Sequence, residues 1–371
     1  MSSNPGHFGL VIGIDSYSSP QFNTLRGASA DAGRFYDWLR AATGGGLPRQ
    51  NLALLTKPRS ETARHPESRE ATWSSVRTQI AEWKKLSNDM QQSIGTRLYI
   101  YLAGHGYNDR DNLNSVHLVL DAYDSTMAES FPGTECGLWF QVKALFDEIV
   151  LIMDCCRDRE LSLTPTPLTF GNEDGVPGRK ESAVRILFSY GAEYGRKSRE
   201  RSLDDQGEVQ GIFTKALLEG LQGGAREAGS DRITCRSLTA YLHARVPELG
   251  PATPPHSVAQ RPNFTPADFN NLTDFEICSV PEALAVVPRR TASLTIEMPP
   301  PFTDVMVWDA KTFNAKTGSY SQRVEPDWHK NADGTWCCPV AGGVYAVVWI
   351  GPEESSSLQL IVVKGDVHAK P

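Results

Sequence analysis

The sequence contains no long hydrophobic run and no excess of positive charge. None of its apolar stretches reaches the roughly 18 residues that a membrane-spanning helix needs. The opening segment Met1–Gly6 lacks the basic and apolar regions of a secretory signal. With 37 lysines and arginines against 44 aspartates and glutamates, the net charge is −7, which does not favour nucleic acid or an anionic membrane as a partner. We therefore expect a cytosolic protein with neither of those partners.

The spacing of the seven cysteines argues against two structural uses. The seven cysteines include no Cys-x-x-Cys pair, so a structural zinc site is not expected. Their number is odd, and the adjacent pairs at 155–156 and 337–338 have poor geometry for a disulfide. We expect reduced thiols and a reducing compartment, in which a thiol nucleophile stays active.

Two short apolar runs end in chemically reactive residue types. The run 149–153 is followed by Asp154–Cys156, and the run 97–103 by Gly104–Gly106, which contains His105. Apolar runs of this length without alternation fit strands that are buried on both faces of a parallel sheet. Ligands bind at the carboxyl edge of such sheets. Two neighbouring strands would therefore bring a histidine to a thiol.

Strand and helix patterns alternate along the first 280 residues. Apolar runs predict further strands at 8–14, 51–55, 116–120 and 184–190. Apolar residues three and four apart predict helices within 28–42, 73–83 and 211–218, and another whose apolar positions are Leu138, Val142, Leu145 and Phe146. Segments 57–70 and 157–181 are expected to be loops. This order predicts an α/β fold with a mainly parallel sheet between helices.

The segments Ala103–Gly106 and Asp154–Cys156 together resemble the caspase-like cysteine peptidases, closest to the prokaryotic caspase and metacaspase-like branch. His105 precedes Cys156 by roughly the 50 residues given for caspases. This branch reads Asp-x-Cys at the nucleophile, whereas animal caspases read Gln-Ala-Cys. A strand, a loop and a Gly-x-Phe-Thr helix within 184–218 extend the resemblance over residues 8–275. It implies a caspase-like three-layer α/β/α sandwich for residues 1–280.

The chemistry of a thiol peptidase assigns roles to these residues. An imidazole raises the thiolate fraction of a nearby thiol and later protonates the leaving amine, so His105 and Cys156 are the predicted catalytic dyad. The backbone N–H groups of Gly106 and Cys156 are the predicted oxyanion donors, as the resemblance also implies. No third catalytic side chain is expected. Side chains alternate along a strand, so Cys155 is predicted to lie in the core.

Two aspartates predict the substrate preference. The resemblance to metacaspases implies that Asp154, and Asp31 in the stretch Leu25–Ala32, line the pocket for the residue before the scissile bond. Two carboxylates favour a cation, so we predict cleavage after Arg or Lys. Arg26 keeps the alternative open, because animal caspases bind aspartate with an arginine in this region. The stretch Arg157–Arg159 departs from the metacaspase pattern and leaves the fine selectivity open.

The resemblance also frames the expected physiology. It implies a signalling protease in cell death or antiviral defence, with protein or peptide substrates and an upstream activator or inhibitor protein. Self-processing is predicted within 157–181 or 196–201, where basic residues occur. No cofactor is expected: Asp121 and Asp124 lie near positions that some metacaspases use for calcium, but they are more typical of turns. The alternative function is a catalytically silent scaffold that binds partners.

The C-terminal part of the chain differs in pattern. Residues 281–291 are predicted to be a linker, and residues 292–371 a small β-sandwich with a docking or regulatory role. The prediction depends on short, turn-separated apolar runs at Ser293–Glu297, Val305–Trp308, Val344–Trp349 and Leu358–Val363. The family resemblance does not extend to this region.

Overall fold

The computed structural model describes most of the N-terminal region and the strands of the C-terminal region. The described residues are 4–20, 22–109, 112, 114–122, 128–157, 166–171, 174–193, 198–202, 209–227, 230–249, 260–266, 275–281, 291–297, 304–309, 313–314, 319–320, 323–324, 329–330, 335–341, 343–350, 356–363 and 367–369. The chain divides into two compact units, residues 1–286 and 287–371. This division falls within the segment 281–291 that the sequence predicts to be a linker.

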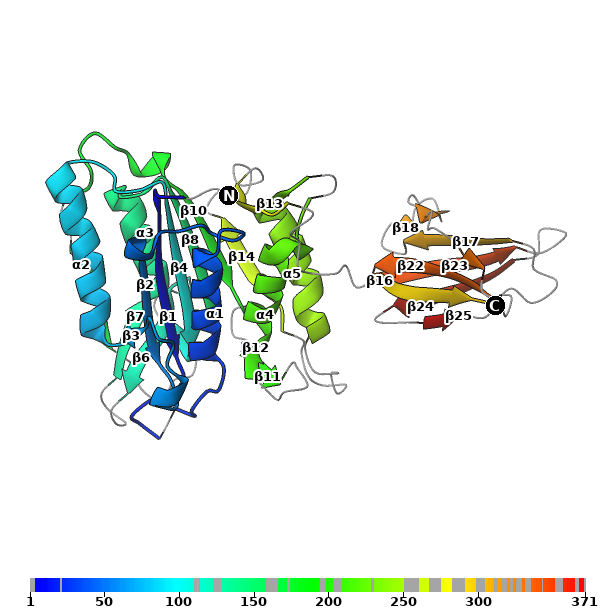
Figure 1. The fold of residues 1–371 in the computed structure, drawn as a ribbon, viewed down its shortest axis with the longest axis horizontal. Helices are drawn as coiled ribbons and strands as arrows, with labels where there is room; N and C mark the ends of the chain where they lie inside the picture. Colours follow the sequence, from blue (N-terminus) through cyan, green and yellow to red (C-terminus); the bar gives the residue numbers. More distant parts are fainter. Residues whose placement is uncertain are drawn as a thin grey trace. The chain divides into compact units, whose positions relative to one another are not determined.

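A seven-stranded sheet forms the centre of the first unit (Figure 1). Its order is β14 (Asn263–Pro266), β10 (Arg185–Tyr190), β8 (Glu148–Cys155), β4 (Arg97–Gly104), β1 (His7–Ile14), β2 (Leu52–Lys57) and β3 (Arg69–Glu70). All neighbouring strands are parallel except β14, which runs antiparallel to β10. The predicted α/β fold with a mainly parallel sheet is confirmed.

Helices cover both faces of this sheet and enclose two separate cores (Figure 1). One face carries α1 (Ala28–Arg40), α4 (Ile212–Glu219) and α5 (Cys235–Leu249), and the other carries α2 (Trp73–Met90) and α3 (Gly133–Lys143). Successive residues of β4 supply the two cores in turn: Leu98, Ile100 and Leu102 pack on the α2 and α3 side, and Tyr99, Tyr101 and Ala103 on the α1 and α4 side. A strand that is buried on both faces reads as a continuous apolar run for this reason.

Smaller elements surround the central sheet. A second sheet has the order β5 (Gly106–Asn108), β6 (Val116–Ala122), β7 (Ala128–Pro132) and β9 (Thr166–Pro167). Two further pairs are β11 (Glu200–Ser202) with β12 (Val209–Gly211), and β13 (Arg232–Thr234) with β15 (Glu276–Ser279). Short helical turns lie at Arg49–Asn51, Glu61–Ala63, Glu181–Ala183 and Gly220–Gly224. Among the described residues, none of the helices combines the length and the apolar character that crossing a bilayer requires.

The prediction for the apolar face of helix α3 is wrong. Leu138 and Val142 are 42% and 52% exposed, while Cys136 and Phe140 are buried. The helix instead packs its small residue Gly137 against Ile186 and Phe188 of β10, which turns the neighbouring large side chains outward. The two predicted loops also contain short strands, β3 within 57–70 and β9 within 157–181.

The elements described in the second unit are all strands, as its short apolar runs predict. One four-stranded sheet comprises β21 (His329–Lys330), β22 (Trp336–Ala341), β16 (Thr291–Ile296) and β25 (Val367–Ala369). The other comprises β20 (Arg323–Val324), β17 (Asp304–Asp309), β23 (Gly343–Ile350) and β24 (Ser356–Val363), and β18 (Phe313–Asn314) pairs with β19 (Ser319–Tyr320). The fully buried Trp349 donates its indole N–H to the Glu297 carbonyl at 2.8 Å.

Candidate active site

The predicted dyad lies at the ends of two neighbouring strands. In the parallel pairing of β4 with β8, Gly104 is opposite Cys155. His105 and Cys156 are therefore the next residues beyond two paired strand ends, at the carboxyl edge of the sheet. The chain turns sharply here, because Gly104 has a φ of +149°, a conformation that residues with side chains rarely adopt. A Cβ at this position would also lie 2.9 Å from the hydroxyl oxygen of Tyr17.

The loop after β1 fixes His105. The ring atom Nε2 of His105 is 2.7 Å from the carbonyl oxygen of Asn23. A carbonyl only accepts, so Nε2 carries the proton in the neutral ring and Nδ1 is the basic nitrogen. The backbone N–H of His105 donates to the Tyr17 hydroxyl at 2.9 Å, and the rings of Tyr17 and Phe22 lie 5.0 and 5.5 Å from the imidazole. This tautomer suits an imidazole that takes a proton from a thiol.

The two adjacent thiols have different surroundings. Cys156 is half-buried, and its Sγ donates to the carbonyl of Ser198 at 3.6 Å. Cys155 is 1% exposed and packs in the core on the α2 and α3 side of the sheet. Burial is the main cause that raises the pKa of the Cys155 thiol well above its ordinary value. Cys155 is therefore a structural thiol, in agreement with its predicted place in the core.

Gly106 lets the backbone of β5 approach Cys155 and Cys156 closely. A Cβ on Gly106 would lie 2.6 Å from Cys155 Sγ and 2.8 Å from the Cys156 carbonyl oxygen, so a larger residue does not fit. The backbones of the two predicted oxyanion donors, Gly106 and Cys156, thus lie side by side. Backbone N–H groups in such a position are a common means of stabilising an oxyanion.

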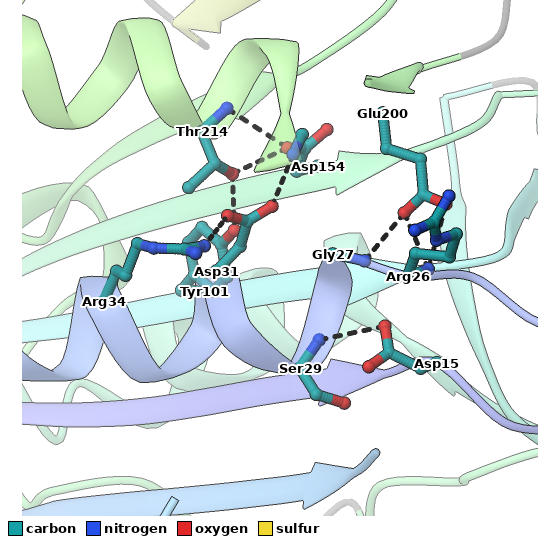
Figure 2. A network of polar contacts seen from close by, with 11 residues as sticks. Asp15, Arg26, Gly27, Ser29, Asp31, Arg34, Tyr101, Asp154, Glu200 and Thr214 are labelled. Carbon is teal, nitrogen blue, oxygen red and sulfur yellow. Dashed lines mark hydrogen bonds and ion pairs between the residues drawn. The ribbon is translucent and has the colours of Figure 1, made fainter. Parts of the chain in front are cut away.

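The two predicted pocket carboxylates lie together on the α1 and α4 side of the sheet (Figure 2). Asp31 and Asp154 are 2% and 8% exposed. Gly211 lies between them: its N–H donates to Asp31 Oδ2 at 2.6 Å, and a Cβ there would collide with the Asp154 carboxylate. Asp154 also accepts from the backbone N–H and the hydroxyl of Thr214 at 3.2 and 2.6 Å, and from the Ser198 hydroxyl.

The surroundings of these two carboxylates shift their pKa values. Burial, and then the charge of Asp154, raise the pKa of Asp31 well above its ordinary value, which Arg34 opposes from 2.7 Å. Burial likewise raises the pKa of Asp154, against the hydrogen bonds from Ser198 and Thr214. Two carboxylates held this close are costly to ionise together, and a positively charged guest would relieve that cost.

Arg26, the residue that keeps recognition of aspartate open as an alternative, lies just before the N-terminal end of α1. Arg26 is exposed, and its backbone N–H donates to the Glu200 carboxylate at 2.9 Å. The N–H of Gly27 donates to the same carboxylate at 2.8 Å, so Glu200 binds the N-terminal end of α1 (Figure 2). Helix α1 and strand β11 are joined here by an acidic side chain, which adds a further negative charge near the pocket.

Sequence reasoning missed the hydroxyl donors of the pocket. The sequence predicts Thr214 only as part of the start of a helix, although the Gly-x-Phe-Thr motif holds both Thr214 and Gly211. Ser198 lies within 196–201, a basic segment for which the sequence predicts self-processing rather than a pocket residue. Serine and threonine hydroxyls are common on protein surfaces, so neither residue by itself identifies a pocket.

The candidate calcium position has a cation partner within the protein. Asp121 accepts from Lys57 Nζ at 2.6 Å and from the Ser18 backbone N–H at 3.0 Å. Asp124 lies outside the described residues. In the part of the chain that the structure describes, no group of three or more His, Cys, Asp or Glu side chains is arranged to hold a metal ion.

Comparison with known proteins places these features in a family. The profile of the caspase domain matches residues 7–271. A probable protease from a Desulfuromonadales bacterium is 26% identical over 226 residues, which are 58% of this chain and 26% of that protein. The chain thus spans about a quarter of the length of this relative. The solved structure of pro-Sf-caspase-1 is 14% identical, covers 71% of this chain and 88% of its own, and has a TM-score of 0.39. Because the family profile covers the whole sheet and both strand ends, the chain belongs to the caspase-domain family of cysteine peptidases.

Proposed function

We propose that the protein is an endopeptidase in which Cys156 is the nucleophile and His105 the general base and acid. Nδ1 of His105 accepts the Cys156 proton, and the thiolate attacks the carbonyl carbon of the substrate. The same nitrogen then delivers the proton to the leaving amine, and water hydrolyses the remaining thioester. The N–H groups of Gly106 and Cys156 are the proposed donors to the oxyanion. Two observations support these roles. The register of β4 with β8 places His105 and Cys156 beyond paired strand ends, and the hydrogen bond from Nε2 to the Asn23 carbonyl leaves Nδ1 as the proton acceptor.

We propose that the enzyme cuts after Arg or Lys. One observation carries this proposal: Asp31 and Asp154, two buried carboxylates, flank Gly211. The Ser198 residue that donates to Asp154 also accepts from the nucleophilic thiol, so the carboxylates and the thiol share one wall. An arginine or lysine side chain would supply the cation that the pair favours, and a guanidinium could bond both carboxylates at once.

A panel of fluorogenic peptides tests this function. Peptides that differ only in Arg, Lys, Asp or Leu before the reporter are incubated with the protein, and the Cys156→Ala variant is the control. We expect turnover of the Arg and Lys peptides and none by the variant. Hydrolysis of the Asp peptide alone would overturn the proposed specificity, and absence of turnover with every peptide would favour the scaffold function.

We also propose a physiological setting. The enzyme is a cytosolic signalling protease in cell death or antiviral defence, controlled by an activator or inhibitor protein, and its C-terminal unit serves docking or regulation. The described cysteines Cys136, Cys155, Cys156, Cys235 and Cys278 are all free thiols, which suits a reducing compartment.

Self-processing is part of this proposal. Ser198 lies beside the Cys156 thiol and follows Arg196 and Lys197 directly in the sequence, although those two residues lie outside the described part. N-terminal sequencing of the incubated protein should therefore show a new terminus within 196–201 or 157–181, and the Cys156→Ala variant should remain intact.

A further inference from the structure

Gln260 is a buried polar residue that sequence reasoning did not single out. It precedes the edge strand β14 and is 5% exposed. Its Oε1 accepts the backbone N–H of Arg199 at 3.0 Å. Its Nε2 donates to the carbonyl of Gly191 at 2.7 Å and to the hydroxyl of Ser198 at 2.9 Å. One side chain therefore joins the end of β10 to the segment that precedes β11.

The bond to Ser198 fixes the direction of a hydroxyl group. A serine hydroxyl has one proton to donate and lone pairs that accept. Gln260 fills an acceptor site of Ser198 with an N–H, so the Ser198 proton points to the Asp154 carboxylate. A chain of hydrogen bonds thus runs from Gln260 through Ser198 to a pocket carboxylate.

Gln260 also fixes the backbone of the same segment. Arg199 is held on both sides, because its N–H donates to Gln260 and its carbonyl accepts the N–H of Ile212 at 2.9 Å. The preceding carbonyl, that of Ser198, accepts from the Cys156 thiol. The Ser198–Arg199 peptide thus lies next to both the Cys156 thiol and the Asp154 carboxylate.

We propose that Gln260 is a positioning residue for the cation pocket: it orients the Ser198 hydroxyl toward Asp154 and holds the wall that carries it. This inference rests on the proposed specificity for basic residues. An uncharged side chain suits the position, since Asp31, Asp154 and Glu200 already make the site acidic. A glutamine supplies both a donor and an acceptor without charge, whereas lysine would compete with the substrate cation and glutamate could not donate to Ser198.

The test measures KM and kcat separately for Arg, Lys and Leu peptides. Gln260→Met keeps the length and apolar packing of the side chain but removes its three hydrogen bonds. Gln79→Met is the matched control: Gln79 is also buried and hydrogen-bonded, to Arg69 and Glu82, but lies in α2 on the opposite face of the sheet. We expect KM for the Arg peptide to rise about 10-fold in Gln260→Met, with little change in kcat, because a hydrogen bond that supports a charged group is lost. The control should match the wild-type protein.

Ser198→Ala is the second variant, and it keeps the proposal testable should Gln260→Met fail to fold. It removes the intermediate hydroxyl, so it should also raise KM for the Arg peptide, and Gln260→Met should add much less to KM in that background. An unchanged KM in Ser198→Ala, or a loss of kcat that is equal for all peptides in Gln260→Met, would overturn the role of Gln260. Absence of a preference for Arg and Lys in the wild-type protein would instead overturn the proposed specificity itself, and the role of Gln260 with it.

Discussion

Successive residues at the carboxyl end of strand β8 lie on opposite faces of the sheet and have different surroundings. On the α1 and α4 side, Asp154 lies close to Asp31 and accepts a hydrogen bond from the hydroxyl of Thr214. On the opposite side, Cys155 lies in an apolar core against Gly106. Cys156, one residue further, leaves the strand at the rim. The comparison shows that strand alternation, rather than residue type, places Cys155 in the core, while Cys156 beyond the strand end is half-buried.

Replacing the two thiols one at a time should give the largest contrast. Cys156→Ala removes the nucleophile and should lower kcat by at least about 10,000-fold. Cys155→Ala should keep most of the activity and cost about 1 kcal/mol of unfolding free energy, because it leaves a small cavity in the core. Peptide hydrolysis and urea unfolding check both variants. A folded Cys155→Ala protein without activity would contradict this distinction between the thiols.

The polar face is tested by neutralising its carboxylates. Asp154→Asn and Asp31→Asn should each lower kcat/KM for the Arg peptide roughly 100-fold, because a buried partner of the substrate cation is lost. Asp37→Asn is the matched control, since Asp37 is in the same helix α1 but its side chain is 66% exposed. An equal loss of kcat/KM with the Arg and Leu peptides would show that the aspartates support the fold rather than the specificity.

The raised pKa of Asp31 gives a smaller effect with a defined sign. Burial makes the folded protein retain a proton that the unfolded chain releases at the ordinary aspartate pKa. Between that value and the raised one, unfolding free energy should therefore fall as pH rises. KM for the Arg peptide should fall over the same range, because the ionised pair binds the cation. Asp31→Asn should weaken both trends.

Unfolding curves and KM values from about pH 4 to pH 8 measure these trends. Asp37→Asn again serves as the control and should follow the wild-type protein. If the unfolding free energy changes with pH in the same way in Asp31→Asn and in the wild-type protein, the pKa of Asp31 is not raised in the folded state.

The smallest effect is expected at Asp121, which lies in strand β6 and on neither of the two faces of β8. Its carboxylate is paired with Lys57, so we expect removal of calcium with a chelator to leave kcat and KM unchanged. Lys57→Met should lower the unfolding free energy by about 1 kcal/mol, as expected when a partly exposed ion pair is removed. Activation of the wild-type protein by added calcium would contradict the expectation that it needs no cofactor.

The sheet and the strand ends could be predicted from the sequence because they depend on local pattern. Buried parallel strands such as β4 and β8 are continuous apolar runs, and the residues that follow them must lie at one edge. The face of α3 could not be predicted in this way, since the close packing of Gly137 decided it. Ser198 and Gln260 also escaped prediction. Their roles depend on hydrogen bonds between segments about 60 residues apart, which no short pattern encodes.

The outer strands of the central sheet have a consequence for how the protein behaves at high concentration. Strand β3 is only two residues long, and both of its residues are charged. Strand β14 ends in Pro266, and Pro262 precedes it, and neither proline has a backbone N–H to donate to an added strand. Lateral growth of the sheet from either side is therefore disfavoured, and the apolar strands between them are shielded from joining those of other molecules in fibrils.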